Sequence, residues 1–386
     1  FLIVVALQSW YVCSTSGQCT LDIRTDLPSN DPVFLNSKGE LWIPDGPSLT
    51  WKKGESTLIL CPGGRNKFNN TADVVKTISC DGKNKLQVDG KAYNKNTTTC
   101  SNAVSGDVQV TKTACAKRGS MVDIGFDGKK QGFKKSFDVC FDFDKGVPIY
   151  TRHTIRGIAT PFAASDAGRP PFKPTGIGKH VDPTTSYTQK YQVDRFTKIL
   201  GDAKLAQKYL NATSYLARGH LTPDHDGIFK THQSATYFYM NVAPEWQGIN
   251  GGNWVRLENA ARAKATSLKD DLEVYTGIYG VAQLKGKGKK AVDLYLEDGS
   301  KIPVPKFYWK ILKYKDSGIG FATINNPFEE NIKPICKDIC AENGWSAPTF
   351  QTATKGYTIC CTVADLIKAI PDVPQDIKVK KVLNFK

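Results

Sequence analysis

Alternating apolar and polar residues form short runs in the first third of the chain. Two examples are Thr57–Cys61 (TLILC) and Met121–Phe126 (MVDIGF), and clusters rich in Gly, Asn, Thr and Lys separate such runs. Short alternating runs between turn-forming clusters are typical of strands, so the pattern predicts a β-rich module from about Gln18 to Cys140. This module contains no catalytic constellation that we recognise, and no histidine.

The pattern becomes mixed after Cys140. A helix is expected to begin at Asn253, and another is expected within Val193–Tyr209. The Pro/Gly-rich stretch Thr160–Thr184 is expected to be a surface excursion. The apolar residues that recur at helical spacing in the first of these helices are Trp254, Leu257, Ala261, Ala265 and Leu268. Strands are expected at Val147–Ile155, Tyr215–His220, Ala235–Pro244, Val274–Gly280 and within Val292–Tyr314. Together these elements predict an α+β domain with antiparallel sheets and flanking helices.

The N-terminal residues suggest a secretory signal. The segment FLIVVALQSWYVCSTSG is apolar and then small, as in the core and cleavage region of a signal peptide. We therefore expect residues 1–17 to be a truncated signal, and a buried N-terminal strand is the alternative. The sequons at Asn69, Asn96 and Asn211 agree with a secreted glycoprotein.

Cysteine spacing supports an oxidising compartment. Of 11 cysteines, Cys13 lies in the expected signal, which leaves ten. They fall into two even groups, Cys19, Cys61, Cys80, Cys100, Cys115 and Cys140, and Cys336, Cys340, Cys360 and Cys361. We expect each group to be bridged within its own region.

The last four cysteines allow a sharper expectation. Cys336 and Cys340 are four residues apart, which predicts that they face the same way on a short helix. They would then pair with Cys360 and Cys361 in either order, because a bridge between those two neighbours would strain the backbone.

The charge of the chain indicates a class of partner. Lysine and arginine number 52 against 37 aspartates and glutamates, which gives a formal net charge of +15. Such a charge attracts polyanions such as nucleic acid, although it also suits a plain solvated surface. The run Lys285–Lys290 (KGKGKK) is either a phosphate contact or a solvated hairpin tip. No apolar run of about 20 residues occurs, so no membrane span is expected.

One histidine stands where hydrolytic chemistry would need it. His220 ends an expected strand and precedes a turn, Thr222-Pro223-Asp224, so its ring is expected at the surface. An imidazole with a pKa near ~6.5 can take a proton from water at neutral pH. Asn250 lies near the start of the next helix, where its amide oxygen could bind Mg²⁺, a cation that takes few protein ligands and favours phosphate. Arg218 offers a planar fork for phosphate, and Gly219 would allow substrate to approach the backbone.

The combined spacing of two segments resembles a known family. Arg218-Gly219-His220, followed by NVAPEWQGINGGNWVRLENAAR at Asn241–Arg262, resembles the DNA/RNA non-specific endonucleases of the ββα-metal superfamily, the secreted arthropod members in particular. The family motif is Asp-Arg-Gly-His, then Asn-x-x-Pro-Gln, and a metal-binding Asn nine residues after the first Asn. In this chain Asn250 is nine residues after Asn241, and Glu258 is eight residues after Asn250.

The resemblance implies a role for each matching residue. His220 would be the general base, Asn250 the one direct protein ligand of Mg²⁺, which Mn²⁺ can replace, and Glu258 a residue that holds metal-bound water. Arg218 and Arg262 would bind phosphate or organise the site. The resemblance also implies an arginine upstream of the histidine that stabilises the transition state, for which Arg152, Arg156 and Arg195 are the candidates. Secreted relatives favour double-stranded DNA, so DNA is the expected partner, with RNA as a second substrate.

Two positions depart from the family motif. Ala217 replaces its first Asp, and Glu245 replaces its Gln. Both lie beside the chemistry, so we expect activity to survive, with altered metal affinity or substrate preference.

The resemblance covers roughly Val147 to the C-terminus. We expect a signal at 1–17, a β-rich disulfide-linked module at 18–141, and the endonuclease domain at 142–386. The main alternative is a non-catalytic polyanion-binding protein that keeps the fold. A zinc hydrolase based on His220, His225 and His232 lacks a matching ligand motif.

Overall fold

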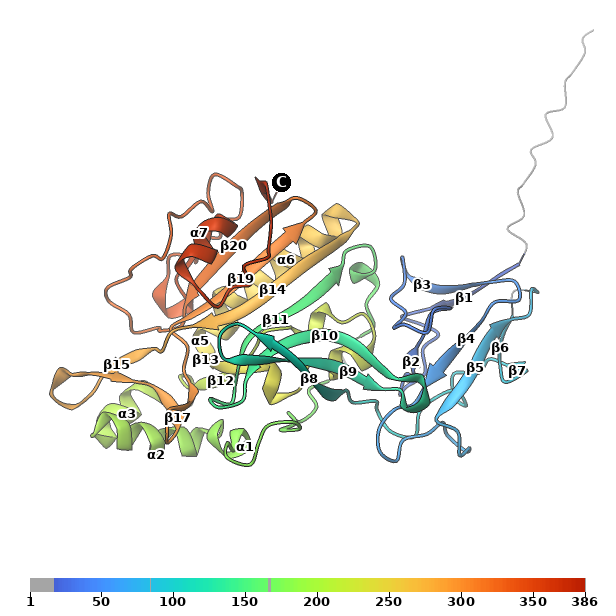
Figure 1. Ribbon diagram of the computed structural model, residues 1–386, viewed down its shortest axis with the longest axis horizontal. Coiled ribbons are helices and arrows are strands. Elements are labelled where there is room, and N and C mark those ends of the chain that lie inside the picture. The colour runs from blue at the N-terminus through green and yellow to red at the C-terminus, as the bar shows by residue number, and fades with distance from the viewer. Residues whose placement is uncertain (1–16, 84, 166–167, 386) are drawn as a thin grey trace, which may run out of the picture.

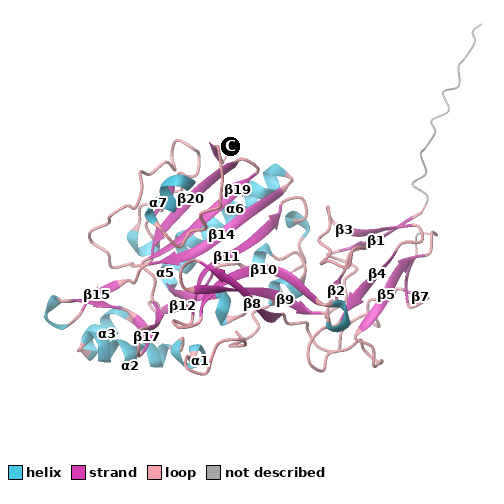
Figure 2. Ribbon diagram, in the orientation of Figure 1, coloured by secondary structure: helices cyan, strands magenta, loops and turns pink. Residues whose placement is uncertain are grey.

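A nine-stranded sheet forms the centre of the molecule (Figures 1 and 2). The computed structural model describes residues 17–83, 85–165 and 168–385, so nearly all of the expected signal lies outside the described residues. The strands run in the order β21-β20-β19-β14-β11-β10-β9-β8, with β22 beside β20. Their bounds are β8 Asp107–Cys115, β9 Gly119–Asp127, β10 Phe133–Asp142, β11 Val147–Arg156, β14 Asp271–Tyr279, β19 Phe307–Tyr314, β20 Ser317–Ile324, β21 Thr358–Cys361 and β22 Lys381–Val382. All neighbours pair antiparallel except β20 and β22. With the helices described below, the sheet confirms the α+β prediction.

The β-rich N-terminal module is real, but its last strands belong to the central sheet. A two-stranded and a five-stranded sheet precede β8. Their strands are β1 Gln18–Asp22 and β3 Ser48–Lys52, and β2 Val33–Phe34, β4 Ser56–Leu60, β5 Val75–Cys80, β6 Leu86–Val88 and β7 Lys91–Ala92. The boundary expected at residues 141 and 142 falls where β10 passes into β11, two strands hydrogen-bonded in one sheet. Phe34 and Leu35 of the module share a core with Val122 and Val139 of β9 and β10.

Helices cover both faces of the β14–β20 half of the sheet. On one face, Trp254, Leu257 and Ala261 pack against Leu272 and Tyr308. Trp254 precedes α6 (Val255–Leu268), which carries the other two helical residues. On the other face, Leu366 of α7 (Val363–Ala369) packs against Trp309 and Ile311. No helix among the described residues is long and apolar enough to cross a membrane.

A third layer lies beside the sheet, built from helices and two hairpins. It consists of α1 Pro183–Ser186, α2 Gln189–Leu200 and α3 Ala203–Tyr209, with β15 Gln283–Lys285, β16 Ala291–Asp293, β17 Tyr295–Glu297 and β18 Lys301–Pro303. The helical segment expected near Val193–Tyr209 is confirmed, but it is divided into two helices. Gly201 ends α2 in the left-handed conformation at φ 72°, and the Asp202 carboxylate caps α3, so two helices form. Lys285–Lys290 spans the tip of the β15–β16 hairpin.

Five disulfides cross-link the chain, three within its N-terminal part and two within its C-terminal part. The bridges are Cys19–Cys80, Cys61–Cys100, Cys115–Cys140, Cys336–Cys361 and Cys340–Cys360. The expected division into two groups is confirmed, and so is the pairing of Cys336 and Cys340 with the adjacent cysteines. The short helix expected at Cys336–Cys340 is wrong, because this segment is a loop. The Asp338 carboxylate holds this loop because it accepts hydrogen bonds from the backbone N–H groups of Cys340 and Cys360.

Candidate active site

A two-stranded ribbon carries the first motif. β12 (Leu216–His220) pairs antiparallel with β13 (Val242–Trp246), so that Ala217 lies opposite Glu245 and His220 opposite Val242. The strand predicted to end at His220 is confirmed. The strand expected at Ala235–Pro244 is present only from Val242 onward, because its aromatic residues pack into the core before the chain becomes extended.

Asn241 fixes the segment that joins these two strands. Its amide donates to the carbonyl oxygens of Thr222 and Thr236, at 2.9 Å each, and its oxygen accepts the N–H of Thr222 at 2.9 Å. Because Asn241 is fully buried, these bonds lock the end of β12 to the start of β13. The first Asn of the second motif therefore has a structural role.

A π-helical turn presents the second motif. After β13 the chain forms α5 (Gln247–Ile249), a π-helical turn at Asn250–Trp254, and α6. Asn253 does not open the helix as expected. Its side chain donates to the carbonyl oxygens of Thr349 and Gly356, at 2.7 and 2.6 Å, and so ties the turn to a distant loop. The buried residues Leu257, Ala261 and Ala265 confirm the predicted face of α6.

His220 lies in an aromatic cluster. Its ring centroid is 5.2 Å from that of Phe172 and 5.1 Å from that of Tyr237. Its Nε2 atom is buried and has no hydrogen-bond partner among the described residues, so the expectation of a surface-exposed ring is wrong at this atom. Burial lowers the pKa of His220 to about 4, although the carboxylate of Asp224 opposes the shift. The ring is therefore neutral at neutral pH, which is the form that accepts a proton.

Arg218 lies in the same cluster. Its guanidinium carbon lies 5.4 to 5.5 Å from the ring centroids of Phe172, Tyr187 and Tyr239. Its Nε donates to the Tyr239 hydroxyl at 3.2 Å. No carboxylate among the described residues pairs with it, so its charge remains available to an anion.

The partly buried Glu258 and the buried Lys310 act on each other electrostatically near the ribbon. Burial raises the pKa of Glu258 to about 7, although the nearby Lys310 ammonium opposes the shift. Burial lowers the pKa of Lys310 to about 8. The Lys310 Nζ donates to Thr276 Oγ1 at 2.6 Å and lies 4.9 Å from the Trp254 ring centroid.

Arg262 belongs to a relay, a chain of contacts through Asp226 to His153, that the sequence did not reveal. Its Nη1 donates to Asp226 Oδ1 at 2.8 Å, and the other Asp226 oxygen lies 2.8 Å from His153 Nε2. Burial opposes ionisation of Asp226, but the hydrogen bond and charge of His153, together with the charge of Arg262, lower its pKa overall. Arg262 is therefore oriented both by Asp226, which contacts His153 of β11, and by Asn259 on its own helix, to whose Oδ1 its Nη2 donates at 2.6 Å.

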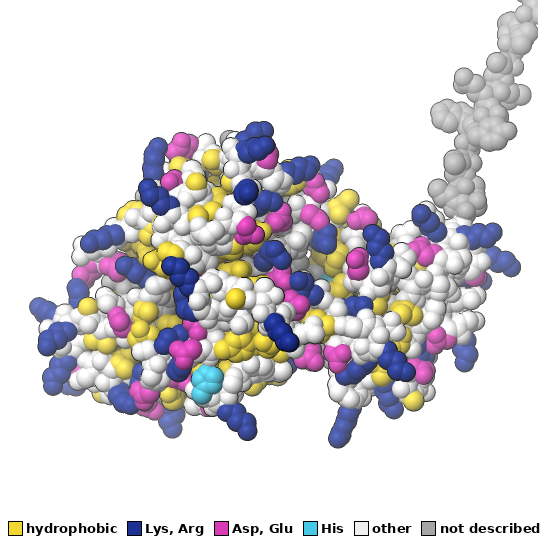
Figure 3. All heavy atoms as spheres, viewed as in Figure 1, with side chains coloured by type: hydrophobic (Ala, Val, Ile, Leu, Met, Phe, Trp, Pro, Cys, Tyr) yellow, Lys and Arg dark blue, Asp and Glu magenta, His cyan; other side chains and the backbone are white. Residues whose placement is uncertain are grey.

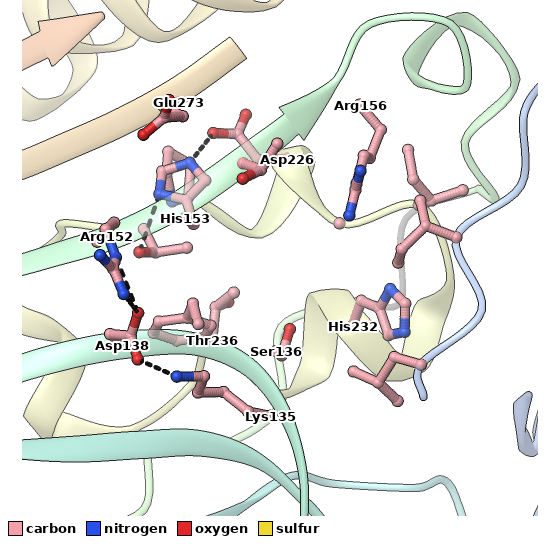
Figure 4. A pocket seen from close by; sticks show the side chains of 18 of the residues that line it. Lys135, Ser136, Asp138, Arg152, His153, Arg156, Asp226, His232, Thr236 and Glu273 are labelled. Carbon is pink, nitrogen blue, oxygen red and sulfur yellow. Dashed lines mark hydrogen bonds and ion pairs between the residues drawn. The ribbon is translucent and has the colours of Figure 1, made fainter. Parts of the chain in front are cut away.

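The same relay forms part of the wall of a cavity of about 540 Å³, shown in Figure 4. β10, β11 and the N-terminal module enclose it, and the lining includes Arg152, His153, Asp226 and Leu41. His220, Asn250 and Glu258 are not among the residues that line this cavity. His220, Asn250 and Glu258 therefore lie outside it, whereas Asp226, and Thr222 two residues after His220, are among its lining residues.

The three candidates for the upstream arginine form ion pairs with other carboxylates. Arg152 pairs with Asp138, and Arg156 pairs with Asp271. Arg195 is buried, where it pairs with Asp298 and donates to the carbonyl oxygens of Tyr295 and Glu297.

The sequence patterns did not point to Arg169. The charge of this arginine contributes to lowering the pKa of His220. Arg169 lies three residues before Phe172, in the Pro/Gly-rich stretch. That stretch is no mere surface excursion, because Lys173 exchanges two backbone hydrogen bonds of 3.0 Å with Tyr237 and Tyr239. Its composition gave no signal for this role.

The side chains in this region suit a hard divalent cation. Asn250 is partly exposed, and no described residue hydrogen-bonds to its amide. Glu245, on β13, is fully buried with both carboxyl oxygens unpartnered, and the charge of Glu258 acts on it. Amide and carboxyl oxygens are the ligands that Mg²⁺ and Mn²⁺ take, and buried unpartnered oxygens call for a cation or an ordered water.

Known proteins resemble the chain over most of its length. The model of the DNA/RNA non-specific endonuclease family matches residues 117–366, a range that begins between β8 and β9. The salivary endonuclease of Lutzomyia longipalpis is 32% identical over 386 residues, covering 96% of this chain and 89% of that protein. The salivary protein Tsal2A of Glossina morsitans morsitans is 29% identical over 388 residues, covering 97% and 96%.

More distant similarities cover less of the chain or are weaker. The human mitochondrial nuclease EXOG is 29% identical over 105 residues, which are 27% of this chain and 28% of that protein. A chain in the crystal structure of the EndoG/EndoGI complex aligns with a TM-score of 0.39 and 16% identity, covering 64% of this chain and 87% of that chain.

Proposed function

This chain belongs to the DNA/RNA non-specific endonuclease family, a family of divalent-metal-dependent nucleases, and we propose that it is a secreted, Mg²⁺-dependent endonuclease. It hydrolyses phosphodiester bonds of double-stranded DNA preferentially, with RNA as a second substrate. The observation that carries the proposal is the partly exposed imidazole of His220, two residues along β12 from the Arg218 guanidinium, which no carboxylate among the described residues neutralises.

His220 acts as the general base in this proposal. Its neutral ring accepts the proton of the attacking water at the ring nitrogen that solvent reaches, because Nε2 is enclosed by protein. The oxygen of that water forms a bond to phosphorus, the bond from phosphorus to the 3′ oxygen breaks, and the products carry 5′-phosphates. The aromatic rings of Phe172 and Tyr237 fix the orientation of the imidazole.

Three arginines contact the substrate phosphate. Arg218, held over aromatic rings, and Arg262, held by Asp226, bind and orient its oxygens. Arg169 takes the role of the upstream arginine, since it lies three residues before Phe172, whose ring centroid is 5.2 Å from that of His220, and its charge acts on the pKa of His220.

Asn250 would hold the metal as its direct protein ligand, and Glu258 would accept hydrogen bonds from its water shell. When bound, Mg²⁺, or Mn²⁺ in its place, supplies positive charge against the developing negative charge on phosphate and leaving oxygen. Because the carboxamide of Asn250 is neutral, it does not offset the positive charge of the cation.

Secretion and nucleic-acid binding are supported by separate observations. Five disulfides form in oxidising compartments, and two of the similar proteins are named as salivary. The net charge of +15 favours association with polyanions, and Lys and Arg side chains are spread over the face in Figure 3.

Plasmid incubated with the purified protein tests the proposal against the alternative of a non-catalytic polyanion binder. We expect nicked and linear DNA with Mg²⁺ and none with EDTA, because the cation is required. Matched duplex DNA, single-stranded DNA and RNA then rank the substrates. A protein that retards plasmid in a gel but leaves it uncut with Mg²⁺ and with Mn²⁺ would be the binder and not the nuclease.

A further inference from the structure

The two departures from the family motif are one structural feature. Ala217 and Glu245 are directly opposed across the β12–β13 ladder, so their side chains lie on the same face of the ribbon. The motif has a carboxylate on the first strand and an amide on the second, whereas this chain has a methyl group and a carboxyl group. The number of carboxyl groups in the pair is therefore unchanged, and only the strand that carries it differs.

The Glu245 carboxyl lies directly against the catalytic strand. A Cβ atom added to Gly219 would be 2.4 Å from Glu245 Oε2 and 2.8 Å from the Tyr308 hydroxyl oxygen. Gly219, between Arg218 and His220, thus makes room for this carboxyl group. The Tyr308 hydroxyl donates to the Ala243 carbonyl oxygen at 2.8 Å, so its proton is already engaged.

No hydrogen bond among the residues that the structure describes explains why a carboxyl group is buried here. Glu245 is 0% exposed, and neither of its oxygens has a partner among the described residues. Burying an unpaired carboxyl group is costly, and such groups in native proteins almost always meet a donor, a water or an ion.

The charged groups around Glu245 indicate what kind of partner its carboxyl oxygens lack. Glu258 and Lys310 act on it electrostatically, and Tyr308 contributes an un-ionised phenol. The Lys310 ammonium donates to Thr276, so it provides no direct partner. Two carboxyl groups thus face one ammonium, and a divalent cation with its water shell would supply both the charge and the donors.

We propose that Glu245 supplies from β13 the carboxylate that the family motif carries at the position of Ala217, and that it helps Glu258 to hold the water shell of the divalent metal. Glu245 is thus a positioning residue for the metal. This inference rests on the proposed function, because it assigns a further residue to the same metal site.

Restoring the residues of the family motif at positions 217 and 245 tests the inference. The variants are Glu245→Gln, Ala217→Asp and the double variant Ala217→Asp/Glu245→Gln, with Glu273→Gln as a matched control. Glu273 is a partly buried glutamate on β14 that pairs with Lys313. Binding of MgCl₂ and of MnCl₂ is measured by titration calorimetry without nucleic acid, together with the metal-induced rise in Tm and the Mg²⁺ dependence of plasmid cleavage.

We expect Glu245→Gln to weaken metal binding about tenfold or more, as loss of a group behind metal-bound water does, while Tm without metal stays level or rises. A merely structural role would move Tm and not metal affinity. Ala217→Asp alone should lower Tm without metal, since it adds an acid opposite a buried one. The double variant should bind metal within about threefold of wild type, and the control should match wild type.

Two results overturn the inference. One is a Glu245→Gln variant with wild-type metal affinity. The other is a double variant that binds metal no better than Glu245→Gln, or that fails to fold, because exchangeability of the pair is what is proposed. If Glu245→Gln alone does not fold, the double variant decides. These outcomes leave the proposed function untouched, which fails only if the wild-type protein cleaves no nucleic acid.

Discussion

The Nε2 atom of His153 lies 2.8 Å from Asp226 Oδ2, and this contact joins strand β11 to the loop that follows His220. The other oxygen of Asp226 accepts from Arg262 on α6, also at 2.8 Å. Both side chains of the His153–Asp226 pair are only 5% exposed. Arg262, which we propose binds phosphate, is therefore linked to the central sheet through two buried side chains.

Replacing His153 should weaken catalysis without touching the substrate. In His153→Ala, Asp226 loses a buried partner, which costs about 1 to 3 kcal/mol of stability, and Arg262 is held less firmly. We expect a lower Tm and a kcat/KM for plasmid cleavage reduced about tenfold at a temperature where the protein stays folded. His180→Ala is the control, since His180 is exposed and bonds only to the Phe143 carbonyl oxygen. Unchanged kcat/KM and Tm in His153→Ala would contradict the relay.

Arg169 and Arg195 should respond in opposite ways. Arg169 is exposed and its charge acts on His220, so Arg169→Ala should reduce kcat about 100-fold with little change in Tm. Arg195 is buried in structural contacts, so Arg195→Ala should chiefly lower Tm. Single-turnover cleavage and thermal melts separate the two effects. Full activity in Arg169→Ala would remove this residue from the site.

Two imidazoles in apolar surroundings should titrate well below their usual pKa. Burial lowers the pKa of both His220 and His232 to about 4. Unfolded chains bind protons at these positions from about pH 6.5 downward, so the free energy of unfolding falls as pH drops from about 6.5 toward 4. NMR titration of the imidazole C–H signals in metal-free protein measures both values, and His232→Phe should flatten the slope of stability against pH. A titration of His220 near 6.5 would contradict its burial.

Asp31 should have the opposite effect on stability. Burial raises its pKa to about 7, against hydrogen bonds from the backbone at Thr231 and its own N–H. A raised carboxyl pKa stabilises the folded state below the unfolded pKa of about 3.8, and this contribution is lost as pH rises through about 7. Asp31→Asn should therefore be more stable than wild type at pH 8, with the difference shrinking as pH falls toward 4. Denaturant unfolding at several pH values measures this, and a pH-independent difference would argue against it.

Local sequence signals predicted the strand that ends at His220 and the buried face of α6, but not where β13 and α6 begin. The apolar spacing of Leu257, Ala261 and Ala265 fixes one face of α6, and the even division of cysteines anticipates the five bridges. Both features depend on neighbours in the chain or on simple pairing. The α+β class follows from the same local patterns.

Long-range contacts account for what the sequence did not reveal. The π-helical turn depends on Asn253 reaching Thr349 and Gly356, about 100 residues away. Phe172 and Arg169 reach His220 only because a Pro/Gly-rich stretch docks beside Tyr237 and Tyr239. His153 and Asp226 carry no motif, and their pairing appears only when β11 meets the loop after β12.

The central claim is that His220 is the general base, and plasmid cleavage by His220→Ala tests it most directly. The account predicts that cleavage with Mg²⁺ falls by a factor of about 100 to 10,000, while DNA binding in a gel shift and Tm stay close to wild type, and His180→Ala cleaves normally. A folded His220→Ala variant that cleaves plasmid at the wild-type rate would contradict the account.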